Sequence, residues 1–292
     1  MEPAASRKSP TYYVHENGFI MPNGFKPEHF YSAQAYVPTE SDIFIATYPK
    51  CGTTWTQYIL YLLKNRGSPL EPGQNINQFI PHIEEVGKEV IEALAEPRTI
   101  KTHLPYNFAP ISSKAKYICV ARNPKDCCVS YYHHTKGFTK YYKFEDGTFD
   151  DYFELFLEGK VDYGDYFDHL LSWFEHRDDP NVLFLLYEEM KADTVGSVRR
   201  IGEFLGGDFL RNVQDSAVLE QIVTNITFEK MKATPSMWSS ERPKKFEAFI
   251  RKGKVGDWRT HFSEEQSNRL DEQFNAKLLG TKAEKLWERF DC

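Results

Sequence analysis

One local feature constrains the fold more than any other: a buried strand that runs directly into a glycine-containing turn and a helix. Residues 42–48 (DIFIATY) are apolar and rich in β-branched side chains, as in a buried strand. Residues 49–52 break this pattern, and residues 53–65 then show helical spacing that ends before Gly67. A buried strand followed at once by a helix is the repeating unit of α/β folds with parallel sheets.

The same alternation continues along the chain. Further strands are predicted at residues 99–103, 116–121 and 182–187. Helices are predicted from Pro124 onward and over residues 165–176, 194–205, 216–223 and 263–279. The sequence therefore predicts an α/β fold in which helices flank a central, mostly parallel sheet, within a single domain over residues 1–292.

Three stretches lack a periodic pattern. Residues 1–38 are rich in Tyr, Pro, Gly and Asn and are predicted to be irregular, and residues 66–81 form a loop. Residues 233–257 are basic and poor in helix signals. Loops of that length in a compact domain are usually functional or mobile, so we expect a mobile loop there.

Composition excludes several classes of protein. The net charge of −6 argues against a nucleic-acid binder, and no apolar run is long enough for a membrane span. The polar N-terminus lacks the apolar core of a signal peptide. The five cysteines are odd in number and lack metal-binding spacing, which indicates free thiols in a reducing compartment, the cytoplasm. No carboxylate cluster is placed to bind a metal.

The turn after the first strand carries the chemistry of an anion site. The free N–H groups of a helix start bind anions, and Gly52 allows close approach of the backbone. Lys50 adds a positive charge, and Thr53 and Thr54 add hydroxyl donors. The order of residues is not that of GxxxxGK[ST] phosphate loops. A simple turn with a capping threonine is an equally good interpretation of the loop alone.

Polar residues also follow two other predicted strands, where parallel sheets bind their ligands. KTHLP at residues 101–105 places Lys101 and His103 at one strand end. Arg122 ends the next strand, and Ser130 follows about two helical turns later. Such an Arg–Ser pair can hold one phosphate group. Taken singly, each is as easily a structural histidine, a surface arginine or a helix-face serine.

Together these motifs resemble the cytosolic sulfotransferases that use 3′-phosphoadenosine 5′-phosphosulfate (PAPS). The matching segments are TYPKCGTTW at residues 47–55, KTHLP, ARNPKD at 121–126 with SYY at 130–132, and RKGKVGDW at 251–258. They occur in family order over residues 40–280. The resemblance implies a phosphate-loop topology like that of nucleotide kinases. It also implies transfer of a sulfuryl group to a hydroxyl or amine of a small molecule, with release of 3′-phosphoadenosine 5′-phosphate (PAP).

The resemblance assigns roles to individual residues. His103 would be the general base, with Lys50, Lys101 and Ser130 assisting, and Ser130 restraining Lys50 until substrate is present. The implied donor site consists of Lys50, Cys51, Gly52, Thr53, Thr54, Trp55, Arg122, Ser130, Tyr187, Thr227, Phe228, Met231, Arg251, Lys252 and Gly253. Two positions depart from the family pattern: Cys51 replaces a serine, and Ile226 replaces a threonine that contacts the adenine.

The acceptor side is less defined by motifs. Aromatic and apolar segments favour phenols, catecholamines or steroids, and the expected wall residues are Phe19, Ile80, His82, Tyr106, His134 and Phe138. Glu84 and Glu85 could select an amine, although two solvated carboxylates are the simpler interpretation. The family's dimerisation motif KxxxTVxxxE is largely lost at residues 259–268, which predicts a monomer or a different dimer.

Two other functions stay open on the sequence alone. A phosphate-loop kinase would need a Gly-Lys-Ser/Thr order and a magnesium-binding aspartate at a strand end, and neither is evident. A non-catalytic nucleotide-binding protein would keep the phosphate loop but would not need both Lys101 and His103.

Overall fold

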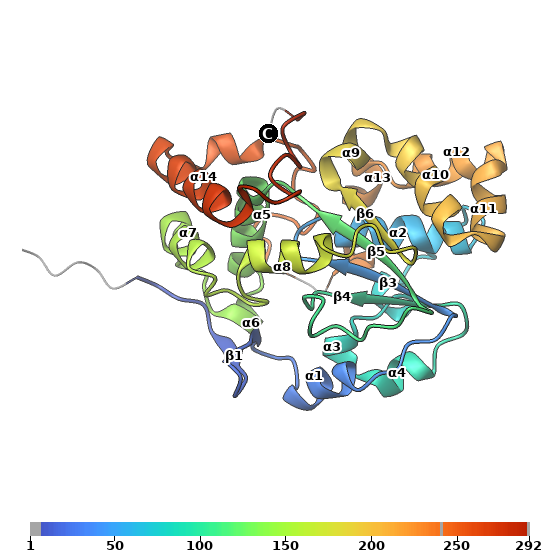
Figure 1. Cartoon of the computed structure of the whole chain (residues 1–292), viewed down its shortest axis with the longest axis horizontal. Coiled ribbons are helices and arrows are strands. Elements are labelled where there is room, and N and C mark those ends of the chain that lie inside the picture. The colour runs from blue at the N-terminus through green and yellow to red at the C-terminus, as the bar shows by residue number, and fades with distance from the viewer. Residues whose placement is uncertain (1–6, 240–241, 291–292) are drawn as a thin grey trace, which may run out of the picture.

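A four-stranded parallel sheet forms the centre of the computed structural model, which describes residues 7–239 and 242–290 (Figure 1). The strand order is β4-β3-β5-β6. The strands are β3 (Asp42–Thr47), β4 (Arg98–Thr102), β5 (Lys116–Ala121) and β6 (Val182–Leu186). The register pairs Asp42 with Arg98 and Ala121 with Leu186, so the carboxyl ends of all four strands lie at one edge. The predicted α/β class is confirmed.

Both faces of the sheet are apolar. Successive side chains of a strand point to opposite faces, and in these strands the side chains on both faces are apolar. In β3, Ile43 and Ile45 belong to one buried cluster, and Phe44 and Ala46 belong to the other. Strands that are buried on both faces need continuous apolar runs rather than alternation, which explains why the DIFIAT segment was recognisable in the sequence.

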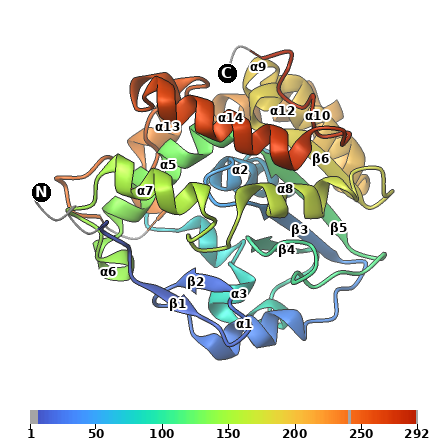
Figure 2. The ribbon, with the colours of Figure 1, turned by 60° about the vertical axis from the view of Figure 1, so that its left-hand side comes forward.

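Helices cover both faces. The face that carries Ile45 packs against α2 (Thr53–Lys64), α9 (Tyr187–Ala192), α10 (Thr194–Leu205), α11 (Gly207–Gln214), α12 (Ser216–Asn225) and α13 (Phe228–Ala233). The other face packs against α1 (Pro27–Gln34), α3 (Ile83–Val86), α4 (Lys88–Glu92), α5 (Pro124–Gly137), α6 (Thr139–Tyr142), α7 (Phe149–Leu157), α8 (Tyr166–Phe174) and α14 (Glu264–Leu278). Figure 2 shows α8 and α14 crossing in front of the strands. No helix among the described residues combines the length and the apolar character needed to cross a bilayer.

The N-terminal segment corrects one prediction. Residues 1–38 were expected to be irregular, but β1 (Tyr12–Val14) pairs antiparallel with β2 (Ile20–Pro22), and α1 follows. The strands have only three residues each, too few for a periodic signal, and α1 is held by burial of Phe30 and Ala33. Long-range packing thus creates structure that local pattern does not encode.

The other predicted elements occur within one or two residues of their expected bounds. Short helices that the sequence did not predict are α3, α4, α6, α7, α9, α11 and α13, together with the 3₁₀ turns Ile76–Gln78, Pro235–Met237 and Asp257–Thr260. Between Pro235–Met237 and Asp257–Thr260, the described residues form no helix or strand. The single-domain organisation and the mobility of residues 233–257 stay predictions.

A buried ion pair joins the amino ends of β3 and β4, at the edge opposite the pocket. Asp42 is fully buried, and its carboxylate accepts hydrogen bonds from Arg98 Nε (2.7 Å), Tyr36 Oη (2.8 Å) and the Thr39 backbone N–H (2.7 Å). Removing one partner of a buried pair is strongly destabilising because the other charge is left without compensation.

We therefore predict that Asp42→Ala lowers the free energy of unfolding by about 3 kcal/mol. Glu96→Ala is the matched control, because Glu96 also pairs with Arg98 (2.8 Å) but is largely exposed, and we expect a loss of less than about 1 kcal/mol. Urea denaturation measures both values. Equal losses in the two variants would contradict the importance of burial at Asp42.

Candidate active site

The turn between β3 and α2 adopts the conformation of an anion-binding loop. Gly52 has φ of 96°, and a Cβ at this position would lie 2.9 Å from Tyr187 Cδ2, so only glycine fits without displacing that ring. The first residues of α2, Thr53 to Trp55, line a pocket at the carboxyl edge of the sheet. The backbone N–H groups of a helix start are available to an anion at such an edge.

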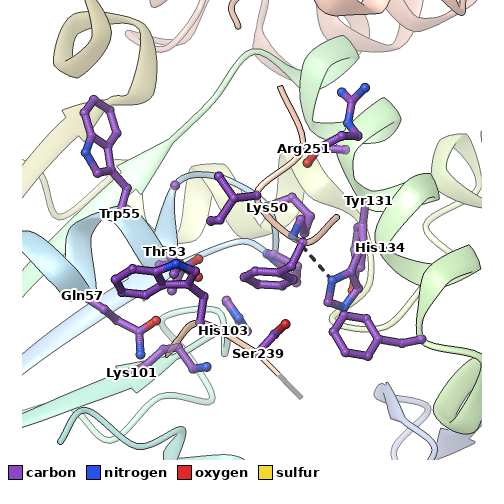
Figure 3. A pocket seen from close by; sticks show the side chains of 18 of the residues that line it. Lys50, Thr53, Trp55, Gln57, Lys101, His103, Tyr131, His134, Ser239 and Arg251 are labelled. Carbon is purple, nitrogen blue, oxygen red and sulfur yellow. Dashed lines mark hydrogen bonds between the residues drawn. The ribbon is translucent and has the colours of Figure 1, made fainter. Parts of the chain in front are cut away.

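Lys50 is half-buried at this pocket and has no carboxylate partner among the described residues. Burial lowers the pKa of its ammonium group to about 7, and repulsion by Arg242 and Arg122 contributes. Its Nζ lies 3.5 Å from His134 Nδ1 and 4.2 Å from the centre of the Phe249 ring (Figure 3). Ser130 also lines the pocket, but the expected Ser130–Lys50 contact is replaced by the contact with His134.

His103 follows β4 and points into the same pocket (Figure 3). Its Nδ1 lies 2.7 Å from the Thr47 carbonyl oxygen. Because a carbonyl only accepts hydrogen bonds, the ring proton sits on Nδ1 and Nε2 keeps its lone pair. Burial lowers the pKa of His103 well below its usual value, and the neighbouring His82 and Lys101 add to the effect. The imidazole is therefore neutral at pH 7 and can accept a proton at Nε2.

Glu84 positions His103 from behind. Its buried Oε1 accepts the His103 backbone N–H (2.6 Å) and the Thr102 hydroxyl (3.2 Å), and it lies 2.8 Å from His82 Nε2. The interpretation of Glu84 as a solvated carboxylate is thus wrong, because these long-range contacts bury it completely. Glu85 is half exposed and lines the pocket.

Lys101 occupies the strand end beside His103. Its Nζ donates to Asn77 Oδ1 (3.3 Å) and reaches the same pocket. Burial lowers the pKa of this ammonium group, while Glu85 and Glu84 oppose the shift. Lys101, Lys50 and His103 therefore line one pocket.

Two guanidinium groups form a second cationic cluster. Arg122, at the end of β5, donates to the carbonyls of Lys50 (3.3 Å) and Lys254 (3.1 Å), and its Nε is buried without a partner in the described structure. Arg251 pairs with Asp257 (2.6 Å), and its Nη1 is likewise buried and unpartnered. Buried donors without acceptors are rare, and an anion such as a phosphate group would satisfy both. The residues present therefore fit a phosphorylated donor.

Aromatic residues border the pocket on the side of α9 and α13. Trp55, Tyr187, Phe228 and Met231 line it together with the backbone of Gly253. The Trp55 indole is fixed by a hydrogen bond from Nε1 to the Ile226 carbonyl oxygen (3.1 Å). Flat aromatic faces of this kind can stack with a purine base.

Two residues of the predicted donor site, Cys51 and Thr227, do not line the pocket, and neither does Ile226, which departs from the family pattern. Cys51 is buried with its Sγ 3.7 Å from Cys127 Sγ, so its replacement of serine does not face the pocket. Ile226 is a core residue, and its carbonyl oxygen accepts the hydrogen bond from Trp55 Nε1. Thr227 is exposed, its hydroxyl bonds the Thr224 carbonyl oxygen, and it does not line the pocket. Lys252 lines the pocket and pairs with Asp257 (2.8 Å).

Half of the residues predicted for the acceptor wall line the pocket. His82, His134 and Phe138 line the pocket. The other three residues pack elsewhere: Phe19 stacks on Phe30, Tyr106 stacks on His176, and Ile80 is a core residue. Sequence proximity to a motif did not determine side-chain direction at these positions.

Several pocket residues escaped the sequence analysis. They are Pro22, Phe25, Gln57, Asn77, Tyr131, Tyr141, Tyr142, Asp162, Tyr163, Lys191, Trp238, Ser239, Phe249 and Ile250. Gln57 was detectable, because it lies four residues after Thr53 and so on the same helix face. Most of the others come from short helices and loops without a motif. Within the described residues, no group of three or more histidine, cysteine or acidic side chains is placed to hold a metal ion.

Comparisons with known proteins agree with this geometry. The family model described as "Sulfotransferase domain" matches residues 40–282. Sulfotransferase 1C2 of Rattus norvegicus is 37% identical over 268 residues, which cover 85% of this chain and 86% of the relative. An amine sulfotransferase of Oryctolagus cuniculus is 37% identical over 265 residues, covering 86% and 85% respectively.

A solved structure gives the same result. The crystal structure of mouse sulfotransferase SULT7A1 complexed with PAP superimposes with a TM-score of 0.76 at 31% identity. The match covers 95% of this chain and 97% of that one. With the basic pocket, the neutral histidine and these matches together, the chain belongs to the sulfotransferase family and is a transferase enzyme.

Proposed function

We propose that this enzyme transfers a sulfuryl group from PAPS to a hydroxyl or amine of a small molecule such as a phenol, a catecholamine or a steroid. The observation that carries the proposal is the convergence of neutral His103 with Lys50 and Lys101 in one pocket. A non-catalytic nucleotide-binding protein would have no use for a base held in this tautomer. When bound, PAPS supplies the activated sulfuryl group, and PAP is the product.

The donor site would draw on both cationic clusters. The unpartnered nitrogens of Arg122 and Arg251, with Ser130, Lys252 and Gly253, are the candidates for holding the 3′-phosphate. The start of α2 and Lys50 would hold the 5′ side, and the aromatic border with Trp55 and Phe228 would receive the adenine. The mouse relative that was solved with PAP supports this assignment.

The residues of the chain would act through position and charge. His103 Nε2 would take the proton of the acceptor hydroxyl, while Nδ1 keeps its own proton and donates it in a hydrogen bond to the Thr47 carbonyl oxygen, which holds the ring in place. Lys50 would neutralise charge that develops on the leaving phosphate oxygen, and Lys101 would stabilise the sulfuryl oxygens. As in phosphoryl transfer, most of the catalysis would come from positioning and electrostatics.

We also propose a cytoplasmic location and a monomer, or a dimer that does not use the family motif. Support for the location comes from four buried free cysteines among the described residues. Support for the monomer comes from Ser263, whose hydroxyl accepts the Gln266 N–H (3.1 Å) and caps its own helix.

His103→Ala should lower kcat for sulfuryl transfer by about 10²-fold or more, because the acceptor loses its general base. Affinity for PAP should stay within about twofold of wild type. Transfer of labelled sulfate from PAPS to a panel of phenols, catecholamines and steroids measures the first quantity, and calorimetric titration with PAP measures the second. His176→Ala, which alters a histidine stacked on Tyr106 outside the pocket, is the control. Full activity of His103→Ala would refute the base assignment.

Affinity for PAP should fall as the pH rises above about 7. Lys50 has a pKa of about 7 in the free protein, and a bound phosphate raises that pKa. Between the two pKa values, binding takes up a proton, so the dissociation constant increases by up to about tenfold per pH unit. Titrations from pH 6.5 to 8.5 should show a smaller slope in Lys50→Met than in wild type or in Lys64→Met, which alters a lysine that bonds the Pro97 carbonyl. An unchanged slope in Lys50→Met would rule out this lysine as the group that takes up the proton.

The oligomeric state has its own test. Size-exclusion chromatography with light scattering should give a mass near 34.1 kDa for a monomer. A dimer that Ser263→Ala combined with Glu264→Ala dissociates would contradict the predicted loss of the family interface.

A further inference from the structure

A buried carboxyl group in the pocket wall has no role in the chemistry described above. Asp162 lies between α7 and α8, is 1% exposed, and lines the pocket. Its Oδ2 accepts the Tyr142 hydroxyl (2.6 Å), but its Oδ1 is buried without a hydrogen-bond partner in the described structure. A half-satisfied carboxyl group in a binding pocket calls for a physical explanation.

The surroundings of Asp162 are aromatic rather than cationic. The Tyr131 hydroxyl donates to its backbone carbonyl (3.2 Å), and Tyr163 follows it in the chain. The Tyr12 hydroxyl is also buried and unpartnered, and the Tyr12 and Tyr142 rings lie 5.9 Å apart. Across residues 7–239 and 242–290, no lysine, arginine or histidine forms an ion pair with Asp162. Burial raises the pKa of this carboxyl to about 6, so it is mostly ionised at pH 7.

An ionised carboxylate in such surroundings is costly unless an opposite charge reaches it. Desolvation of a single buried ion costs several kcal/mol, and the hydrogen bond from the Tyr142 hydroxyl compensates only part of this. The missing partner must donate a hydrogen bond and carry positive charge. An ammonium group does both, and the aromatic rings of Phe25, Phe138 and Tyr141 that line the same pocket favour a cation further.

The place of Asp162 relative to the base fits the far end of an acceptor. The Tyr163 ring lies 5.3 Å from the His103 ring, centre to centre, and Asp162 is its immediate neighbour in the chain. Lys50 and Arg122 follow β3 and β5, and Lys101 lies near the carboxyl end of β4, where the donor is expected. The pocket therefore combines cations at the sheet edge with a buried carboxyl group on the segment that carries Tyr163.

We propose that Asp162 is a specificity-determining residue that binds a protonated amine, so that the preferred acceptors are phenols with a cationic alkylamine side chain. The proposal rests on the sulfuryl-transfer function proposed above and narrows its acceptor class. The phenolic hydroxyl faces His103, and the ammonium group satisfies Asp162 Oδ1. Steroids and neutral phenols bring no charge to this oxygen and are bound less tightly.

The test compares two acceptors of nearly equal shape, tyramine and 4-propylphenol, with wild type and Asp162→Asn. Asparagine keeps an oxygen to accept the Tyr142 hydroxyl but removes the charge. Wild type should prefer tyramine in kcat/KM by about tenfold or more, and Asp162→Asn should abolish or reverse this preference. The change should appear mainly in KM, with PAP affinity and thermal stability preserved. Glu85→Gln, which alters the half-exposed carboxylate of the same pocket, should keep the preference.

Several results would overturn the proposal. One is a wild type without preference for tyramine over 4-propylphenol, and another is an equal loss on both acceptors in Asp162→Asn. The second result would mean that Asp162 only supports the wall, for instance through a water shared with the Tyr12 hydroxyl. A loss of preference in Glu85→Gln alone would assign the selection to that residue instead.

Two further measurements keep the outcome independent of folding and of catalysis. Should Asp162→Asn fail to fold, wild type is compared on tyramine and N-acetyltyramine, which has the same phenol without the charge, and equal kcat/KM refutes the proposal. Should no transfer occur, both phenols are titrated calorimetrically into free enzyme and into enzyme with PAP. Tighter binding of tyramine then supports Asp162 as an amine site even where the sulfuryl-transfer proposal fails, and equal binding refutes it.

Discussion

Repulsion among the cations that gather at one pocket is the constraint on which the pocket depends. Burial lowers the pKa of Lys50, and repulsion by Arg242, Arg122 and Arg251 lowers it further. Such a cluster persists because carboxylates hold the guanidinium groups in place, Asp126 beside Arg122 (3.7 Å) and Asp257 beside Arg251 (2.6 Å). The pocket side stays positive in a chain whose net charge is −6. A bound anion therefore reduces the repulsion among these cations.

Asp126 also connects two distant segments of the chain at the pocket. Its carboxylate accepts the backbone N–H groups of Gly256 (2.8 Å) and Trp258 (3.0 Å). These bonds tie the segment that carries Arg251 to the first turn of α5, although the two are about 130 residues apart in sequence. The two halves of the cationic site thus share one rigid support. Disturbing this carboxylate would displace both halves together.

The sequence predicted the sheet, and it predicted most of the polar residues that line the pocket at the sheet edge, because both are encoded locally. Apolar runs mark strands that are buried on both faces, and the residues that follow them must meet at one edge of a parallel sheet. The acceptor side was predicted poorly because side-chain direction depends on distant packing. Phe19 and Tyr106 are aromatic but are partly buried away from the pocket, whereas no signal in the sequence indicated Asp162. Glu84 resembles a surface residue in the sequence, because its hydrogen-bond partner, the His103 backbone N–H, is 19 residues away and comes near only in the folded chain.

In the described part of the chain, four cysteines are free and buried: Cys51, Cys119, Cys127 and Cys128. The rate at which they react with a thiol reagent can therefore report local unfolding of this chain. A thiol reagent can modify these sulfurs only when the packing around them has separated, so labelling kinetics follow local unfolding rather than surface chemistry. Cys119 reports on the central strand β5, whereas Cys51 lies in the turn between β3 and α2, with its sulfur 3.7 Å from that of Cys127 in α5. A ligand bound in the pocket would then slow the modification of Cys51 and Cys127, so binding could be followed without an engineered label.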